Sequence, residues 1–284
     1  MLTGVLLVDA CILGVLGLLI GSFLNVVVFR LPKMMERQWA AECAELSGKD
    51  VGSTEDAAPF NLVVPRSRCP KCAHPIAWYE NIPVASYAFL RGKCSSCKTA
   101  ISARYPLVEL VTGGLFFYCA WVFGATPTGL IWCAFSAALL TLALIDWDTT
   151  LLPDDITLPL LWMGLIAAAV HWIPVTLNSA LWGAVAGYLS LWSIYWAFKL
   201  ATGKEGMGYG DFKLYAALGA WFGWQTLIPI ILMASVIGAI VGIAMKFTSG
   251  LRDGGYVPFG PFLAGAGFTA LLVGPEVLRN FVGL

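Results

Sequence analysis

The 284-residue chain is 59% hydrophobic and only 12% charged, whereas soluble domains carry about 25% charged residues. This composition predicts a membrane protein with several spans and excludes a soluble globular domain. A formal net charge of zero, without a basic run of the nucleic-acid-binding type, argues against DNA or RNA as a partner. Eleven of the 17 Lys and Arg residues lie between positions 30 and 104, so that segment is predicted to be aqueous.

The first apolar run, residues 5–29, is long enough to span a membrane. It lacks a basic N-terminal region and a small-residue cleavage site, so we interpret it as a retained helix rather than a cleaved signal peptide. Arg30, Lys33 and Arg37 follow it, and the positive-inside rule therefore places that end in the cytoplasm and the N-terminus outside. Small residues at near-helical spacing predict close helix packing, and Asn25 is expected to form an interhelical hydrogen bond.

Residues 31–104 form the predicted cytoplasmic insertion. Its first part, up to Pro59, has little apolar periodicity and is interpreted as helix plus loop or poorly ordered chain. Its second part contains two Cys-x-x-Cys pairs, and four thiolates presented by two short turns are typical of a structural, tetrahedral Zn²⁺ site. A cytoplasmic location keeps thiols reduced and a redox site needs one such pair, so we favour zinc over a redox dithiol or a disulfide pair. The predicted ligands are Cys69, Cys72, Cys94 and Cys97.

Apolar runs resume after Arg104 and continue to the end of the chain. With the first helix they predict an all-α polytopic fold of about eight transmembrane helices, which places the C-terminus outside as well. The predicted organisation is a first transmembrane helix at 1–30, the zinc-binding insertion at 31–104 and a seven-helix core at 105–284. The later helices are predicted at about 106–124, 128–145, 157–173, 179–199, 212–224, 226–247 and 259–279.

Two aspartates, Asp146 and Asp211, stand at the ends of apolar runs about 65 residues apart, and the predicted topology puts both at the cytoplasmic face. Two carboxylates forced together share one proton, which is an arrangement that activates water for peptide hydrolysis. Ionisable groups at membrane depth are costly and usually functional. Two alternatives stay open at this point. Asp211 is also a favoured N-cap for a helix that starts at Phe212, and Asp148 could replace Asp146.

A glycine-rich turn, Gly-Met-Gly-Tyr-Gly at 206–210, directly precedes Asp211. Glycine lets another backbone approach closely, so an acid beside such a turn can meet a peptide. A later motif at 257–262 puts prolines at the start of the last predicted helix, and we regard it as a candidate for one side of a substrate groove. The candidate groove residues are Gly208, Gly210, Pro258 and Gly260.

These motifs, in this order and over most of the chain, resemble the type IV prepilin peptidases of bacterial pilus and type II secretion systems. The Gly-x-Gly-Asp turn alone would also fit other intramembrane aspartyl proteases, and residues 38–60 match nothing in the family pattern. The matching pieces are Gly21-Ser22-Phe23-Leu24-Asn25 with Arg30-Leu31-Pro32, the two cysteine pairs, Ile145-Asp146 through Leu152-Pro153-Asp154, the Gly-Tyr-Gly-Asp turn, and Pro258-Phe259-Gly260-Pro261-Phe262.

The resemblance implies a bacterial inner-membrane enzyme that acts on prepilins and pseudopilins. Such enzymes cut a short basic leader after a glycine on the cytoplasmic side and then methylate the new N-terminal residue with S-adenosylmethionine. It implies that Asp146 and Asp211 are the catalytic acids and that the four cysteines hold zinc, but it names no residues for S-adenosylmethionine. Two other classes of protein remain as alternatives. One is a transporter whose aspartates relay protons or bind a cation, and the other is a non-catalytic assembly scaffold held together by the zinc module.

Overall fold

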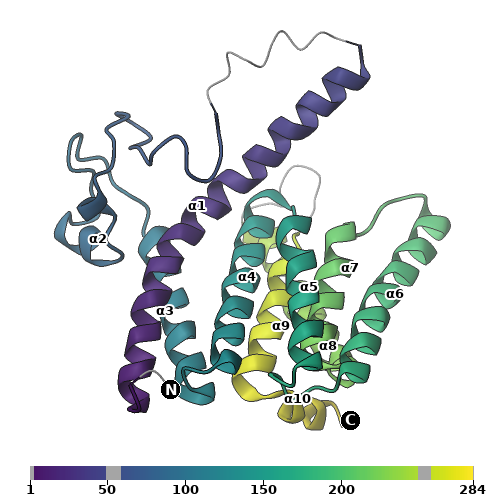
Figure 1. Cartoon of the computed structure of the whole chain (residues 1–284). Coiled ribbons are helices and arrows are strands. Elements are labelled where there is room, and N and C mark those ends of the chain that lie inside the picture. The colour runs from purple at the N-terminus through teal and green to yellow at the C-terminus, as the bar shows by residue number, and fades with distance from the viewer. Residues whose placement is uncertain (1–2, 49–58, 249–256, 284) are drawn as a thin grey trace. The chain divides into compact units, whose positions relative to one another are not determined.

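The structure is a computed structural model that describes residues 3–48, 59–248 and 257–283. Within these residues every regular element is a helix (Figure 1), as predicted. The chain divides into two compact units, Met1–Cys133 and Ala134–Leu284. Four helices in the described chain are long and apolar enough to cross a membrane, or five if a bent pair near the C-terminus is one span. The count of eight spans therefore stays a prediction.

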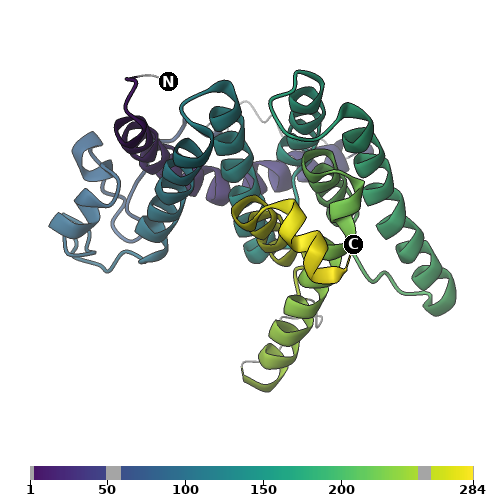
Figure 2. The ribbon, with the colours of Figure 1, turned by 90° about the horizontal axis from the view of Figure 1, so that it is seen from below.

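The first unit is built on two helices that lie side by side in Figures 1 and 2, α1 (Leu6–Leu46) and α3 (Arg104–Phe123). A Cβ added to Gly21 of α1 would lie only 2.8 Å from the Cα of Glu109 in α3. The Asn25 side-chain amide donates to the backbone oxygen of Tyr105 at 3.2 Å. Both the predicted close packing and the predicted interhelical hydrogen bond are therefore confirmed.

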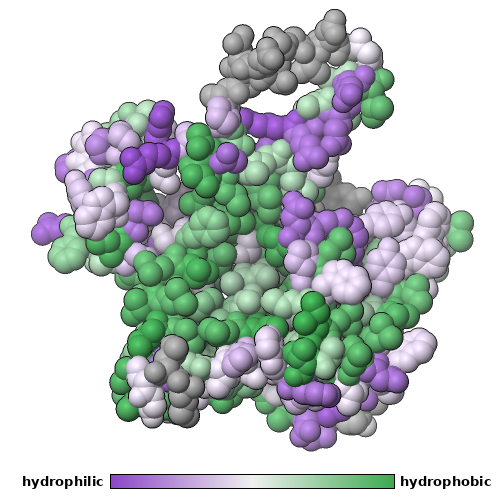
Figure 3. Space-filling view, viewed as in Figure 1, coloured by the Kyte–Doolittle hydropathy of each residue, from purple (hydrophilic) through white to green (hydrophobic). Residues whose placement is uncertain are grey.

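Helix α1 does not stop at the end of the first apolar run. It continues through Pro32 to Leu46, so the start of the insertion is helical. Figure 3 shows the change in character along it: the part against α3 is apolar, and the part toward its C-terminal end is hydrophilic. The buried Arg30 donates to the backbone oxygens of Asn61 and Pro65 at 2.9 and 2.6 Å, which fastens the chain that leads to the cysteine pairs onto α1.

The cysteine-containing part of the insertion has little regular structure. It contains a short 3₁₀ helix, η2 (Trp78–Asn81), and one five-residue helix, α2 (Ala85–Phe89). It is tied to the first unit by Glu109 of α3, whose Oε2 accepts a hydrogen bond from the Val84 N–H at 2.8 Å. The insertion is thus anchored to α1 through Asn61 and Pro65 and to α3 through Val84.

The second unit is organised around α7. Nearly every residue of this helix is buried, from Asp211 to Phe222, as expected of a helix that is apolar on all sides. The Trp221 indole N–H donates to the Leu160 oxygen of α5 at 2.9 Å. The helices of this unit are α4 (Pro127–Thr149, which begins in the first unit), α5 (Asp154–Ala169), α6 (Leu177–Thr202), α7 (Tyr209–Phe222), η3 (Trp224–Thr226), α8 (Leu227–Thr248), α9 (Gly260–Val273) and α10 (Pro275–Val282).

The prediction of a single last helix is wrong. Instead of one helix over 259–279, α9 ends at Val273 and α10 leaves it at 109°. Gly274 has a φ of +95°, a conformation that suits glycine, and Pro275 cannot continue the hydrogen-bond ladder of α9. Figure 2 shows this turn, and it also shows one end of α8 projecting away from the other helices of the unit.

Candidate active site and candidate metal centre

Asp146 lies in the last turn of α4 and is only 4% exposed. The C-terminal end of a helix is an unfavourable place for an anion, because the unpaired carbonyl groups point that way. A residue from a distant part of the chain stabilises the Asp146 carboxylate and offsets this cost. The backbone N–H of Gly260, the first residue of α9, donates to Asp146 Oδ2 at 2.9 Å, and a helix N-terminus favours a negative charge.

Gly260 has to be glycine for this contact. A Cβ at this position would lie 2.6 Å from Asp146 Oδ2, closer than real Cβ contacts come, and 3.1 Å from its Cγ, which is tighter than most of them. The preceding Pro258 is buried. The proline-rich motif thus brings a backbone donor against one of the two predicted acids, and its part in a substrate groove stays a prediction.

Asp211 lies inside the first turn of α7, not before it. The helix begins at Tyr209 with Gly208 as its N-cap residue, so the alternative that Asp211 caps a helix starting at Phe212 is wrong. The side chain is 8% exposed, and its Oδ1 is buried without a hydrogen-bond partner in the described chain. A buried polar atom without a partner is costly and calls for an explanation.

The fold brings Asp146 and Asp211 within electrostatic range of each other. Two carboxylates buried at such range repel each other when both are ionised, so ionising the second is more costly than ionising the first. Asp148, the alternative to Asp146, is exposed. The arrangement offers one carboxylate to accept a proton and one carboxylic acid to donate a proton, which is what general acid–base hydrolysis requires.

Gly210 is needed for packing inside the protein. A Cβ at Gly210 would lie 2.6 Å from the Cβ of Leu152, in the connection between α4 and α5. The glycine-rich turn therefore seats the first turn of α7 against the chain that follows Asp146. A role for Gly208 or Gly210 in contacting a substrate stays a prediction.

Two ion pairs on the segments that precede and follow the glycine-rich turn were not predicted from the sequence. Lys213, two residues after Asp211, contacts Asp154 of α5 at 2.7 Å. Lys199 contacts Glu205 at 2.8 Å and the Tyr195 hydroxyl at 3.2 Å, and its hydrogen bond lowers the pKa of Glu205. The sequence did contain a signal for these ion pairs, because charged residues in an otherwise apolar sequence need partners.

The four predicted ligand cysteines converge in the insertion. Their sulfur atoms all lie within 4.8 Å of one another. The Cys69–Cys97 and Cys72–Cys94 sulfur distances are 3.7 and 4.0 Å, close to the roughly 3.8 Å that tetrahedral Zn–S bonds of about 2.3 Å imply. They are far longer than a disulfide bond of about 2.0 Å. The donor set therefore fits a tetrahedral, thiophilic metal ion.

The two cysteine pairs fold as copies of one hairpin, 25 positions apart. In the first, the Cys69 N–H donates to the His74 oxygen at 2.9 Å, and in the second the Cys94 N–H donates to the Thr99 oxygen at 2.9 Å. Each hairpin turns at a residue of positive φ, Ala73 or Lys98, both at +57°. Each turn thus presents its two sulfurs in the same way, and together the turns surround one point.

Hydrogen bonds in this cluster favour some thiolates over others. The Thr99 hydroxyl and N–H lower the pKa of Cys97 to about 6, and the backbone N–H groups of Cys72 and Lys71 lower the pKa of Cys69. Desolvation and the three neighbouring sulfurs outweigh the His74 backbone hydrogen bond and raise the pKa of Cys72 to about 11. Four thiols this close cannot all ionise unless a cation compensates their charge.

Fold and site define a helical membrane protein with a buried pair of aspartates and a four-cysteine module. Residues 15–123 match the family model described as Bacterial Peptidase A24 N-terminal domain, and residues 133–243 match that of the Type IV leader peptidase family. The chain belongs to the type IV leader peptidase family, whose members are peptidases and N-methyltransferases by the names of its relatives.

Three such relatives carry the name prepilin leader peptidase/N-methyltransferase. The Pseudomonas aeruginosa protein is 55% identical over 267 residues, which cover 94% of this chain and 91% of the relative. The Stutzerimonas stutzeri protein is 53% identical over 271 residues, with 94% and 92% covered. An Aeromonas salmonicida protein is 52% identical over 271 residues, with 94% and 91% covered. No solved structure matches the chain.

Proposed function

We propose that this protein removes the basic leader of type IV prepilins and pseudopilins and then methylates the new N-terminus with S-adenosylmethionine. The observation that carries the proposal is the pair of buried aspartates, Asp146 at the end of α4 and Asp211 in the first turn of α7. Gly208 and Gly210 shortly precede Asp211, and Pro258 shortly precedes Gly260, which contacts Asp146; these four residues are proposed to border the substrate groove.

In the proposed cleavage the two acids exchange protons with water and peptide. The ionised carboxylate takes a proton from a water molecule while the oxygen of that water attacks the scissile carbonyl carbon, and the protonated carboxylic acid gives its proton to the carbonyl oxygen. Breakdown of the tetrahedral intermediate transfers a proton to the leaving nitrogen and restores the shared proton. The Gly260 N–H holds one oxygen of Asp146 throughout.

The membrane arrangement is part of the same proposal. The chain crosses a bacterial inner membrane eight times, with both termini outside and the acids and the insertion on the cytoplasmic side. A prepilin, with a basic leader before an apolar helix, would present its cleavage site at that face. The cysteine module would hold a structural Zn²⁺ ion, because four sulfurs complete its coordination and leave no open position for water.

The test is incubation of the purified full chain with a prepilin and labelled S-adenosylmethionine, followed by measurement of cleavage and methyl transfer. Asp146→Ala or Asp211→Ala should slow cleavage by at least about a hundredfold, in line with the loss of a general acid or base. Asp148→Ala is the matched control, and it should cleave at the wild-type rate.

Three outcomes would count against the proposal in different ways. Cleavage by Asp146→Ala with loss of cleavage in Asp148→Ala would move the catalytic role to Asp148. A wild-type protein that leaves prepilin intact would contradict the peptidase proposal. Cleavage without methyl transfer would contradict only its second half.

A further inference from the structure

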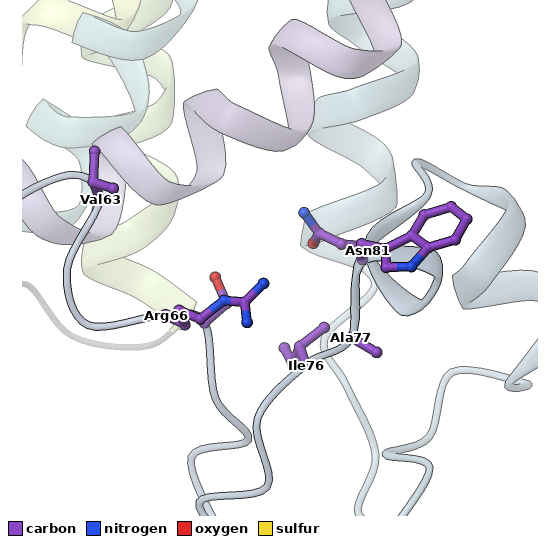
Figure 4. Close-up of a pocket in the computed structure, with 7 residues that line it drawn as sticks. Val63, Arg66, Ile76, Ala77 and Asn81 are labelled. Carbon is purple, nitrogen blue, oxygen red and sulfur yellow. The ribbon is translucent and has the colours of Figure 1, made fainter.

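The insertion contains a pocket that the acids and the cysteines do not account for. Its volume is about 280 Å³, just under the roughly 300–1,000 Å³ typical of small-molecule sites. In Figure 4 the Arg66 guanidinium and the Asn81 amide face each other across it. It is lined by Val63, Arg66, Ser67, Ile76, Ala77, Trp78 and Asn81.

The walls of the pocket are extensions of the first cysteine hairpin. The Ile76 N–H donates to the Ser67 oxygen at 2.9 Å, and the neighbouring residues Arg68 and Pro75 pair across the same hairpin. This hairpin closes on Cys69, so a metal ion bound by the cysteines would also hold the two walls together.

The remaining wall, η2, is fixed by Glu80. Its Oε2 accepts a hydrogen bond from the Ala77 N–H at 2.9 Å and lies 3.8 Å from His74 Nε2. The hydrogen bonds of Ser95 and Ala77 lower the pKa of this carboxyl, which keeps it ionised. Trp78 and Asn81, which both line the pocket, therefore lie on a turn with a defined position, and the nearby acid is already engaged.

The polar groups of the pocket are left available for a ligand. No hydrogen bond or ion pair within the described ranges engages the Arg66 side chain, and Asn81 is exposed. Trp78 is 77% exposed, although an indole ring gains much from burial against another surface. The Arg66 guanidinium and the Asn81 amide thus border one space, and Trp78, whose ring packs edge to face with Tyr79 at 5.8 Å, is one of the residues that line it.

We propose that this pocket binds S-adenosylmethionine, an inference that rests on the methyltransferase half of the proposed function. The Trp78 ring offers a stacking surface for adenine, and the Asn81 amide can donate to and accept from the edge of an adenine base. The Arg66 guanidinium matches a carboxylate with two parallel hydrogen bonds, and the methionyl part of the ligand carries such a group.

The chemistry of methyl transfer determines what the pocket residues have to do. Bound S-adenosylmethionine supplies a methyl group on a positively charged sulfur. A neutral α-amino nitrogen forms a bond to that carbon as the sulfur–carbon bond breaks, and S-adenosylhomocysteine and a methylated ammonium group remain. Arg66, Trp78 and Asn81 bind and orient the donor, and none of them has to exchange a proton.

The experiment is equilibrium dialysis of labelled S-adenosylhomocysteine against the purified full chain. Arg66→Ala should weaken binding by roughly tenfold or more, since a charge-assisted hydrogen-bond pair is lost, and Arg66→Lys should recover part of the loss. Trp78→Ala should weaken binding and Trp78→Phe should retain most of it. Lys93→Ala removes an exposed cation from the second hairpin, away from the pocket, and should bind like the wild type.

Zinc content measured on each variant reports whether the module still folds. Normal binding by Arg66→Ala and Trp78→Ala would overturn the pocket assignment, and so would equal competition by ATP or by adenosine alone. In either case methyl transfer by the wild type would leave the proposed function standing. Absence of methyl transfer by the wild type, with prepilin cleaved, would instead remove the function on which the inference rests.

Discussion

At the scale of single residues, the site depends on what surrounds each acid. Asp146 sits at an unfavourable helix end and is stabilised by a backbone N–H from Gly260, while Oδ1 of Asp211 has no partner in the described residues. The two carboxyls therefore have different surroundings. We expect this difference to decide which of the two acids is protonated in the proposed cleavage.

Gly260→Ala tests this arrangement. The added Cβ would lie 2.6 Å from Asp146 Oδ2, so either the carboxylate or the start of α9 must shift and the hydrogen bond must lengthen. We expect leader cleavage to fall by at least about tenfold, since small displacements of catalytic groups are costly. Gly265→Ala, in the same helix, meets no atom within 4 Å and is the matched control. Wild-type cleavage by Gly260→Ala would show that the contact is not needed.

At the scale of elements, the cysteine module is formed mainly by contacts between residues that are close in the sequence. Each Cys-x-x-Cys pair closes its own hairpin through local hydrogen bonds, so the spacing along the chain was enough to predict the four candidate ligands. The sequence did not reveal that the same module contains a pocket, because its walls depend on the hydrogen bonds that Ile76 donates to Ser67 and Ala77 donates to Glu80.

Cys97→Ser should release the metal and loosen the module, because a hydroxyl is a poor replacement for a thiolate at a tetrahedral zinc site. The measurements are the metal content of the purified protein and its thermal unfolding. Cys43→Ser changes an exposed cysteine outside the cluster and should alter neither. A pure wild-type protein without zinc would contradict the metal assignment.

The same site should lose metal as the pH falls. Metal binding displaces protons from the thiols, so affinity decreases once protons compete for the sulfurs. Because Thr99 holds the pKa of Cys97 near 6, this sulfur should remain a ligand to lower pH than an ordinary cysteine would. A Thr99→Val variant should therefore release zinc at higher pH than the wild type in a titration followed by metal release.

At the scale of the whole molecule, the number of spans is the main open prediction. Helices α7 and α9 have 14 residues each and are about 21 Å long, against a hydrocarbon core of about 30 Å. Their apolar runs look like spans in the sequence, but helix breaks at Gly223 and Gly274 shorten them.

A reporter that is active only outside the cytoplasm can test this topology. Fused after Leu284 it should be active, because eight crossings from an outside N-terminus return the chain to the outside. Fused within the insertion it should be inactive, since Arg30, Lys33 and Arg37 favour the cytoplasm. An inactive C-terminal fusion, with the insertion also inside, would mean an odd number of crossings.

Composition, short spacings and charges in apolar runs are local properties, so the amino-acid sequence was enough to predict the helical class, the four candidate cysteine ligands and the two candidate acids. The folded chain was needed to show that Gly260 contacts Asp146 across 114 positions, that Asp211 lies within α7, that the last helix turns at Gly274 and that a pocket lies beside Arg66. These features depend on which surfaces pack together. Packing is settled by the shape and burial of many side chains at once, and no short stretch of sequence records it.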